Sequence, residues 1–476
     1  MNTQSTQAAP VKSRVVSNVV KGCLGNLIEW YDWFVYASFS IYFAAEFFPS
    51  GNPTAQLLST AAVFAVGFLM RPLGGWLLGM YADRHGRRNA LAASVLLMSA
   101  GSLTIGLTPS FDTIGIWAPI LLVFARLIQG LSVGGEFGSS ATYLSEVATP
   151  GRRGFFSSFQ YVSIIIGQLS ALLVMILLQR ILTPEQMGEW GWRIPFIIGA
   201  VAGLLVMVLR RSMDESEHYK LEKARSEAET ASTGKKPVGS LRALLQYPKQ
   251  LIAVFCLAIG GTVSFYVYTT YMQKYMVNTS GIAKEDASVI SFVALFLFMF
   301  LQPIAGGLSD RYGRRKVMLF FSIGGTIVTV PVLTILADTT NVFAAFGLMM
   351  LCLVFVSGYT ACASIVKAEM FPTRVRALGV GLPHALVAAS FGGTVEPIGL
   401  ALKQAGMEST FFWYVTGCIA LTLVASFMVK EPSKNSSLEA DLVQTTPHTE
   451  GATSRSGAHS PEAPELSPAG SGSARN

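Results

Sequence analysis

Four polar side chains recur on one face of the first apolar stretch of the chain. Asn26, Glu29, Asp32 and Tyr36 follow one another at spacings of three, three and four residues, which places them on one side of an α-helix. A carboxyl group in such a stretch is costly to bury and therefore marks a functional site by default. We expect this face to line a cavity, with Asp32 taking up and releasing a proton and Glu29 as the rival proton carrier.

Two arginines lie inside later apolar stretches. Arg126 is placed at a depth similar to that of Asp32, and we expect these two side chains to form a charge pair that weakens when Asp32 is protonated. Arg71 and Arg126 are also predicted anchors for an anionic substrate, because a guanidinium group can donate two parallel hydrogen bonds to a carboxylate. The alternative for Asp32 and Arg126 is a static ion pair that holds two helices together. The alternative for Arg71 is a structural ion pair with Glu29 or Glu136.

Other polar residues could complete a binding site for such an anion. Tyr36, Gln168 and Tyr266 are predicted substrate contacts, because each lies on a polar face of its stretch and can hydrogen-bond a carboxylate or keto oxygen. The alternative is that they form hydrogen bonds between helices. His384 could change its charge near neutral pH, but we interpret it as a polar contact between helices.

The stretches that carry these residues determine the class of protein. Hydrophobic residues make up 51% of the 476-residue chain and charged residues 13%, and the mean hydropathy is +0.48, which is too apolar for a soluble fold. A helix needs about 20 residues to cross a bilayer. The expected fold class is an all-α membrane protein with twelve transmembrane helices, over 18–47, 56–81, 89–109, 115–141, 154–181, 190–210, 250–277, 286–308, 316–337, 341–366, 376–402 and 410–429.

Basic residues set the expected orientation. Most of the 35 Lys and Arg residues fall in the N-terminal arm, alternate loops, the central segment and the tail, with Lys367, Arg374 and Arg376 in one such loop. The positive-inside rule places these segments in the cytoplasm. The expected organisation is a cytoplasmic arm over 1–17, a first half over 18–210, a cytoplasmic linker over 211–248, a second half over 249–430 and a disordered cytoplasmic tail over 431–476.

The net charge of +7 is explained by this orientation, so the expected surroundings are a lipid bilayer and not a nucleic acid. The five cysteines are scattered and form no C-x-x-C pair. The sequence also lacks a P-loop, a metal-ligand cluster and a catalytic triad. We expect no metal, no cofactor and no enzymatic activity.

A ten-residue pattern, G-x-x-x-D-R-x-G-R-R, occurs after the second and again after the eighth stretch, and similar segments begin at Glu146 and Glu369. Two copies at corresponding places indicate two parallel six-helix halves, an architecture of transporters. We expect each motif aspartate to lie at the N-terminus of a neighbouring helix and the arginines to bind nearby carboxylates. The predicted gating residues are Gly79, Asp83, Arg84, Gly86, Arg87, Arg88, Glu136, Glu146, Asp310, Arg311, Gly313, Arg314 and Glu369.

Alternatives remain for two of these groups. The motif arginines could serve only to fix the topology. Glu136 follows two glycines and could form a structural ion pair or transfer a proton instead of controlling a gate.

The repeated motif resembles the signature of the major facilitator superfamily. Four further stretches are similar to its metabolite–proton symporter family: Gly25–Asp32, Arg71–Gly75, Arg126–Glu136 and Trp192–Phe196. Within that family, Tyr271–Thr279 and Lys367–Pro372 resemble the carriers of 2-oxoglutarate. Some proton-coupled members of the superfamily have an acidic residue in the first span and an arginine in the fourth. This resemblance implies that Asp32 carries the proton and that Arg126 is its charge partner.

This resemblance implies a monomeric, proton-coupled importer of a small dicarboxylate, with 2-oxoglutarate as the first candidate. It would lie in the bacterial inner membrane and work by alternating access. Succinate, a 3-oxoadipate-like acid, citrate, betaine and proline remain alternative substrates. A membrane sensor that binds its ligand without moving it is the alternative from another class.

Overall fold

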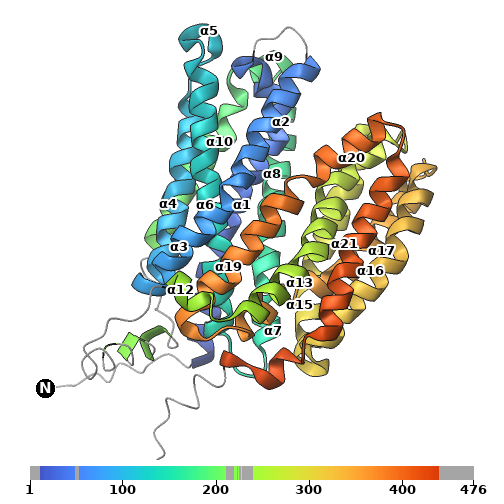
Figure 1. The fold of residues 1–476 in the computed structure, drawn as a ribbon. Helices are drawn as coiled ribbons and strands as arrows, with labels where there is room; N and C mark the ends of the chain where they lie inside the picture. Colours follow the sequence, from blue (N-terminus) through green and yellow to red (C-terminus); the bar gives the residue numbers. More distant parts are fainter. Residues whose placement is uncertain are drawn as a thin grey trace, which may run out of the picture.

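The computed structural model describes residues 11–48, 53–210, 219–221, 223–224, 227 and 240–438. Within these residues the chain is helical and contains no strand. Figure 1 shows two helical bundles placed side by side. The expected arm and linker are described only in part, and the expected tail lies outside the described residues after Leu438.

The first bundle contains six long helical segments in the part of the chain that is described, and several of them are broken. One break falls at Met70, because the ring of Pro72 and its missing N–H would interrupt a continuous helix. Pro72 instead lies in the first turn of the next helix, where the missing N–H is harmless. The elements are α1 (Val11–Phe47), α2 (Pro53–Leu69), α3 (Arg71–His85), α4 (Arg87–Leu107), α5 (Phe111–Ile114), α6 (Trp117–Val147), α7 (Arg153–Ser157), α8 (Phe159–Ile181), α9 (Pro184–Gln186), the π-helical turn η1 (Met187–Gly191) and α10 (Arg193–Arg210).

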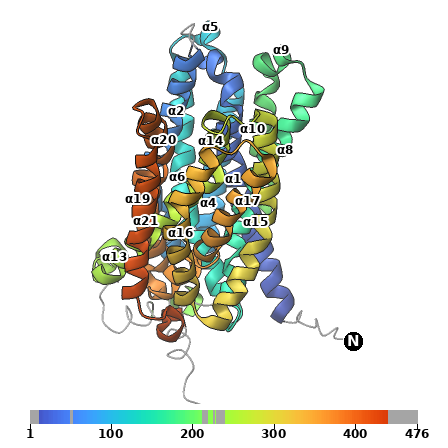
Figure 2. The ribbon, with the colours of Figure 1, turned by 90° about the vertical axis from the view of Figure 1, so that its right-hand side faces the viewer.

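The second bundle repeats this arrangement, and Figure 2 looks onto it. Two of its segments pass through a π-helical turn, a feature that is frequent at functional sites. The elements are α12 (Ser240–Leu244), α13 (Pro248–Tyr266), the π-turn η2 (Val267–Tyr271), α14 (Met272–Asn278), α15 (Lys284–Tyr312), α16 (Arg314–Ala337), α17 (Val342–Thr360), α18 (Ala363–Glu369), the 3₁₀ turn η3 (Thr373–Val375), α19 (Arg376–Val387), the π-turn η4 (Ala388–Gly392), α20 (Val395–Gln404) and α21 (Glu408–Met428).

Most of the expected spans coincide with helices that are long and apolar enough to cross a membrane. Among the described residues there are 10 such helices, and 11 if Pro184–Gly191 and Arg193–Val208, bent by 45°, count as one span. The remaining expected span corresponds to α1, which is long enough at 37 residues but carries the polar stripe and is not in that set. The expected all-α fold of two six-helix halves is therefore confirmed.

The two copies of the repeated motif form the same tight turn between consecutive helices. Gly86 joins α3 to α4 with φ 99°, and Gly313 joins α15 to α16 with φ 100°. Glycine is the residue that adopts this conformation at little cost. The two turns lie at the same end of the bundles, called the motif end below. The bundles converge there and diverge toward the tips of α2 and α20 (Figure 1).

Candidate functional site

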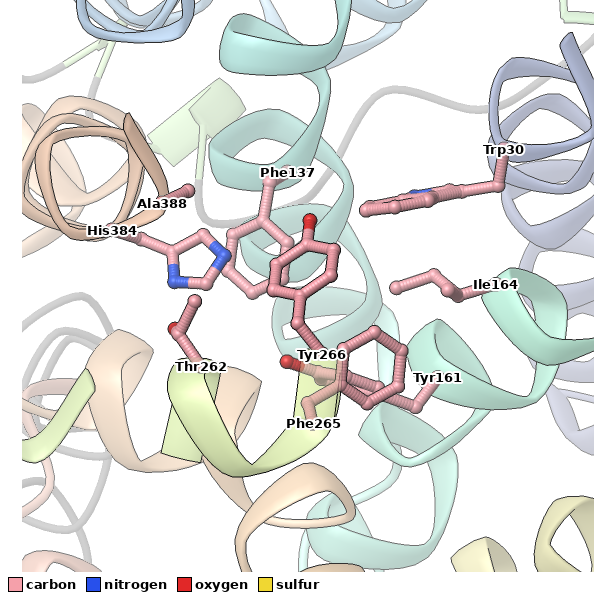
Figure 3. A pocket seen from close by; sticks show the side chains of 9 residues that line it. All are labelled: Trp30, Phe137, Tyr161, Ile164, Thr262, Phe265, Tyr266, His384 and Ala388. Carbon is pink, nitrogen blue, oxygen red and sulfur yellow. The ribbon is translucent and has the colours of Figure 1, made fainter. Parts of the chain in front are cut away.

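A pocket lies where the two bundles face each other, and both halves contribute to it. From the first half come residues of α1, α6 and α8, and from the second half residues of α13, α19 and η4. Its lining residues are Trp30, Phe137, Tyr161, Ile164, Thr262, Phe265, Tyr266, His384 and Ala388 (Figure 3). The pocket is narrow, with room for about one water molecule. A larger ligand therefore needs the aromatic rings to move apart.

Arg71 connects the halves beside this pocket. It begins α3, its side chain is buried, and its Nη1 donates a hydrogen bond of 2.9 Å to the hydroxyl group of Tyr266. Its guanidinium lies 4.2 Å from the ring centre of Trp33 and 4.0 Å from that of Phe68. Its Nε and Nη2 atoms have no hydrogen-bond partner. This cation is thus held by aromatic faces and keeps two donors for an anion.

Arg126 lies deeper in the first half. Its guanidinium is 4.2 Å from the ring centres of both Trp33 and Tyr36, and its Nη1 donates 2.8 Å to Oε1 of Gln129. It is fully buried and is not among the residues that line the pocket. Arg71 does not line the pocket either, but it bonds Tyr266, which does, so in this conformation Arg71 is closer than Arg126 to the position of a substrate anchor.

Asp32 does not form the direct ion pair with Arg126 that the sequence suggests. Its carboxylate faces α10, where a Cβ atom added at Gly199 would lie 1.8 Å from Oδ1, and Ser102 of α4 lies beside it. The absence of a side chain at Gly199 leaves the space that the carboxylate occupies. Between Arg126 and Asp32 lie Gln129, which accepts from Arg126, and Ser102, to whose Oγ Gln129 donates at 2.9 Å.

The polar stripe of α1 does not line the pocket as a unit, which corrects the expectation from its spacing. Neighbouring helices surround α1, so its polar residues meet different partners. Asn26 donates to the backbone oxygen of Gln160 at 3.0 Å, and Tyr36 donates 3.1 Å to the backbone oxygen of Thr60. Glu29 is fully buried. Within the described part of the chain, Trp30 is the residue of α1 that reaches the pocket.

Two other predicted substrate contacts lie at the interface between the halves. Tyr266 lines the pocket and binds Arg71. Gln168 of α8 donates 3.4 Å to the backbone oxygen of Thr269, and its Oε1 has no hydrogen-bond partner. Gln168 therefore links α8 to η2 across the interface and retains one acceptor.

At the motif end, Asp310 of the second half binds the start of a helix in the first half. Its two carboxylate oxygens accept 2.8 Å hydrogen bonds from the backbone N–H groups of Gly154 and Phe155 in α7. Arg314, one turn later, donates 2.7 Å to the same carboxylate and lies 3.4 Å from Glu369. A carboxylate is favoured at this position because unpaired N–H groups concentrate positive charge at a helix N-terminus.

Asp83 occupies the equivalent position in the first half. Its Oδ2 accepts from the backbone N–H of Leu378, in the first turn of α19, at 3.4 Å. Gly79 lets the same two helices approach, since a Cβ atom there would lie 3.2 Å from the Cα atom of Leu378. A fully buried ion pair between Glu146 and Arg376, 2.8 Å long, also joins the halves at this end.

The other motif residues have local contacts or face solvent. Glu136 is buried and accepts 2.7 Å from Ser94. Arg84 and Arg311 are exposed, Arg88 is half-buried, and the side chain of Arg87 lies outside the described residues. Glu431, which follows α21 in the chain, stabilises the turn at Gly313. Its carboxylate accepts hydrogen bonds from the backbone N–H groups of Arg314 and Arg315. Burial opposes ionisation of this carboxyl group, but bonds from Ser433 and that backbone hold the pKa of Glu431 below its ordinary value.

Sequence reasoning missed Lys367, which it placed in a loop. Lys367 lies in α18 with 1% of its surface exposed, and its Nζ is 3.2 Å from Nδ1 of His384 and 3.4 Å from the hydroxyl group of Tyr359. The misplacement arose because α18 extends the tenth span by another turn beyond the apolar run. His384 does make a contact between helices, but it also lines the pocket.

Comparisons with known proteins agree with this architecture. Residues 19–441 match the family described as sugar (and other) transporter. The chain is 51% identical to the alpha-ketoglutarate permease of Escherichia coli (strain K12) over 416 residues, 87% of this chain and 94% of that protein. It is 32% identical to the citrate-proton symporter of Klebsiella pneumoniae over 437 residues, 90% of this chain and 96% of that protein.

A solved structure has the same fold. The major facilitator superfamily proton:xylose symporter XylE, bound to 6-bromo-6-deoxy-D-glucose, superposes with a TM-score of 0.75 at 19% sequence identity, covering 90% of this chain and 99% of that chain. The family match spans most of the sequence, and the relatives align over nearly their whole length. The chain therefore belongs to the sugar (and other) transporter family.

Proposed function

We propose that this chain is a proton-coupled symporter that imports 2-oxoglutarate by alternating access. The observation that carries this proposal is Arg71, a buried guanidinium at the junction of the two halves with two unpartnered donors beside the pocket. Burying a cation without a carboxylate is costly, so its position favours an anionic substrate. The 51% identity with a curated alpha-ketoglutarate permease supports 2-oxoglutarate as that anion.

Proton coupling is assigned to Asp32 and its indirect connection to Arg126. Arg126 donates to Gln129, and Gln129 donates to Ser102, which leaves the hydroxyl hydrogen of Ser102 free to point at the Asp32 carboxylate beside it. All three donors thus point toward Asp32. Protonation of Asp32 removes the negative charge beside Ser102, where this chain of hydrogen bonds ends, which loosens the hold on Arg126. Glu29 remains the rival proton carrier.

Alternating access would use the contacts at the motif end as its gate. Here the halves are joined at that end by the bonds of Asp83 and Asp310 and by the Glu146–Arg376 pair. Breaking them would let the pocket open toward the motif end. The distribution of basic residues supports a cytoplasmic location for this end, for both chain termini and for the linker over 211–248.

The location and assembly follow the same proposal. We place the carrier in the bacterial inner membrane, with transport halves over 18–210 and 249–430 and cytoplasmic segments over 1–17 and 431–476. One chain supplies both walls of the pocket, so a monomer is sufficient for transport, and no catalytic chemistry on the substrate is needed.

Uptake into proteoliposomes tests this function. Purified protein is reconstituted, a pH gradient is imposed, and accumulation of labelled 2-oxoglutarate is compared with that of succinate, 3-oxoadipate, citrate, betaine and proline. We expect 2-oxoglutarate to accumulate only with the gradient and to be released by a protonophore. If no carboxylate accumulates, the proposal is wrong. Binding without uptake would favour a sensor.

A further inference from the structure

Lys367 is a buried cation for which the described residues provide no carboxylate. Its surroundings are the hydroxyl group of Tyr359, the imidazole of His384 and the ring of Phe137, whose centre lies 4.8 Å from Nζ. The nearby Glu369 is bound to Arg314 instead. An ammonium group that is 1% exposed and faces only neutral groups creates a strong local preference for an anion.

His384 connects this cation to the pocket. An ammonium group has donors only, so a charged Lys367 binds Nδ1 when this nitrogen accepts and the ring proton sits on Nε2. The ring stacks on Phe137 with centres 3.7 Å apart, and Figure 3 shows its other nitrogen directed toward the middle of the pocket. His384 therefore presents an N–H donor to the pocket, with the positive charge of Lys367 directly behind it.

Arg71 and this pair belong to opposite halves of the protein. Arg71 is reached from the pocket through Tyr266, to which it donates a hydrogen bond of 2.9 Å, and Tyr266 and His384 both line the pocket. A ligand with two carboxylates can satisfy both basic groups at once, whereas a monocarboxylate satisfies one.

We propose that His384 and Lys367 form a second carboxylate subsite, which faces the Arg71 subsite across the pocket and selects dianions over monoanions. This inference rests on the proposed function, because it requires an organic acid to bind in the pocket. It adds the basis of selectivity: one carboxylate binds each half, so the dianion bridges the two halves.

The test compares two ligands that differ by one carboxylate. 2-Oxopentanoate has the carbon chain of 2-oxoglutarate with a methyl group in place of the distal carboxylate. Binding of both to the full-length protein is measured by calorimetry in the wild type, in Lys367→Met and in Lys316→Met. Lys316 is an exposed lysine of the same half and serves as the matched control.

We expect the wild type and Lys316→Met to prefer 2-oxoglutarate by about tenfold or more, the value of one hydrogen bond to a charged group. Lys367→Met should bring this ratio close to one by weakening 2-oxoglutarate alone. Retained binding of 2-oxopentanoate shows that the variant is folded. If Lys367→Met cannot be purified as a folded protein, His384→Gln in the same comparison should lower the ratio.

Two results would overturn the inference. One is a variant that loses affinity for both ligands by the same factor, and the other is an unchanged preference for 2-oxoglutarate. In either case the wild type still binds 2-oxoglutarate, and the proposed function stands. If the wild type itself binds neither ligand, the proposed function and the subsite fail together.

Discussion

Arg126 is a fully buried cation that is separated from the carboxylate of Asp32 by two other side chains. Sequence reasoning identified both charges, because ionisable residues are rare in apolar stretches and therefore conspicuous. It could not identify Gln129 and Ser102 as the link, since polar neutral residues are frequent in such helices. It also missed Lys367, because a lysine next to an apolar run resembles a loop residue until the helix is seen to continue.

Asp32→Asn should abolish gradient-driven accumulation while preserving exchange of 2-oxoglutarate across the membrane. The amide has nearly the shape of the carboxyl group but cannot bind and release a proton. The measurement is uptake in proteoliposomes with and without a pH gradient, alongside counterflow without one. Asp112→Asn, at an exposed aspartate in α5, is the control. Uphill uptake at the wild-type level in Asp32→Asn would transfer the proton role to Glu29.

Gln129→Leu should lower gradient-driven uptake by about tenfold, the rate change that corresponds to roughly 1.4 kcal/mol for one hydrogen bond to a charged group. The substitution keeps the bulk of the side chain and removes both of its hydrogen bonds. Counterflow should fall much less, since binding at Arg71 is untouched. Gln179→Leu, at an exposed position of α8, is the control. An equal loss in both assays would mean that Gln129 has a purely structural role.

At the scale of elements, each half of the protein binds the start of a helix in the other half. Asp310 accepts from the N-terminus of α7, and Asp83 from the first turn of α19. The general position of these aspartates was predictable, because a helix N-terminus attracts a carboxylate. The partner helices were not, since the sequence repeat reports which segments are equivalent and not which of them are in contact.

Gly138→Ala should weaken closure at the motif end. A Cβ atom at Gly138 would lie 2.7 Å from the backbone oxygen of Ala377 and from the Cα atom of Gly381, so α6 and α19 must separate, at a cost of about 1–3 kcal/mol. Hydrogen–deuterium exchange should rise in α19 relative to the wild type. Gly417→Ala is the matched control, because a Cβ atom there meets nothing within 4 Å. Unchanged exchange in Gly138→Ala would contradict this packing.

On the scale of the whole molecule, composition and the internal repeat were sufficient to predict a two-half membrane carrier. The conformation was not predictable, because the same sequence must be compatible with both sides of the transport cycle. The structure shows the halves joined at the motif end, with a narrow pocket between them. The contacts that join the two halves, such as the Glu146–Arg376 pair, are between residues far apart in the sequence. A local sequence pattern does not predict such contacts.

The buried pair of Glu146 and Arg376 supplies the corresponding prediction. Glu146→Gln or Arg376→Gln alone should destabilise the protein by about 3–5 kcal/mol, because each leaves a charge buried without its partner. The double variant should be more stable than the sum of the single losses predicts. Thermal unfolding in detergent measures the three variants against the wild type. Additive losses would show that the two side chains do not interact in the folded state.

The motif aspartates receive hydrogen bonds from backbone N–H groups of the opposite half, and this has an evolutionary consequence. Every amino acid except proline offers such a group. Phe155 opposite Asp310 and Leu378 opposite Asp83 can therefore change their side chains over generations without losing these bonds. Gly154 is the exception, because a Cβ atom there would lie 2.2 Å from Oγ of Ser309. Selection acts unequally on the two sides of each contact: the aspartate is constrained in identity, whereas the receiving helix start is constrained mainly in shape and in the exclusion of proline.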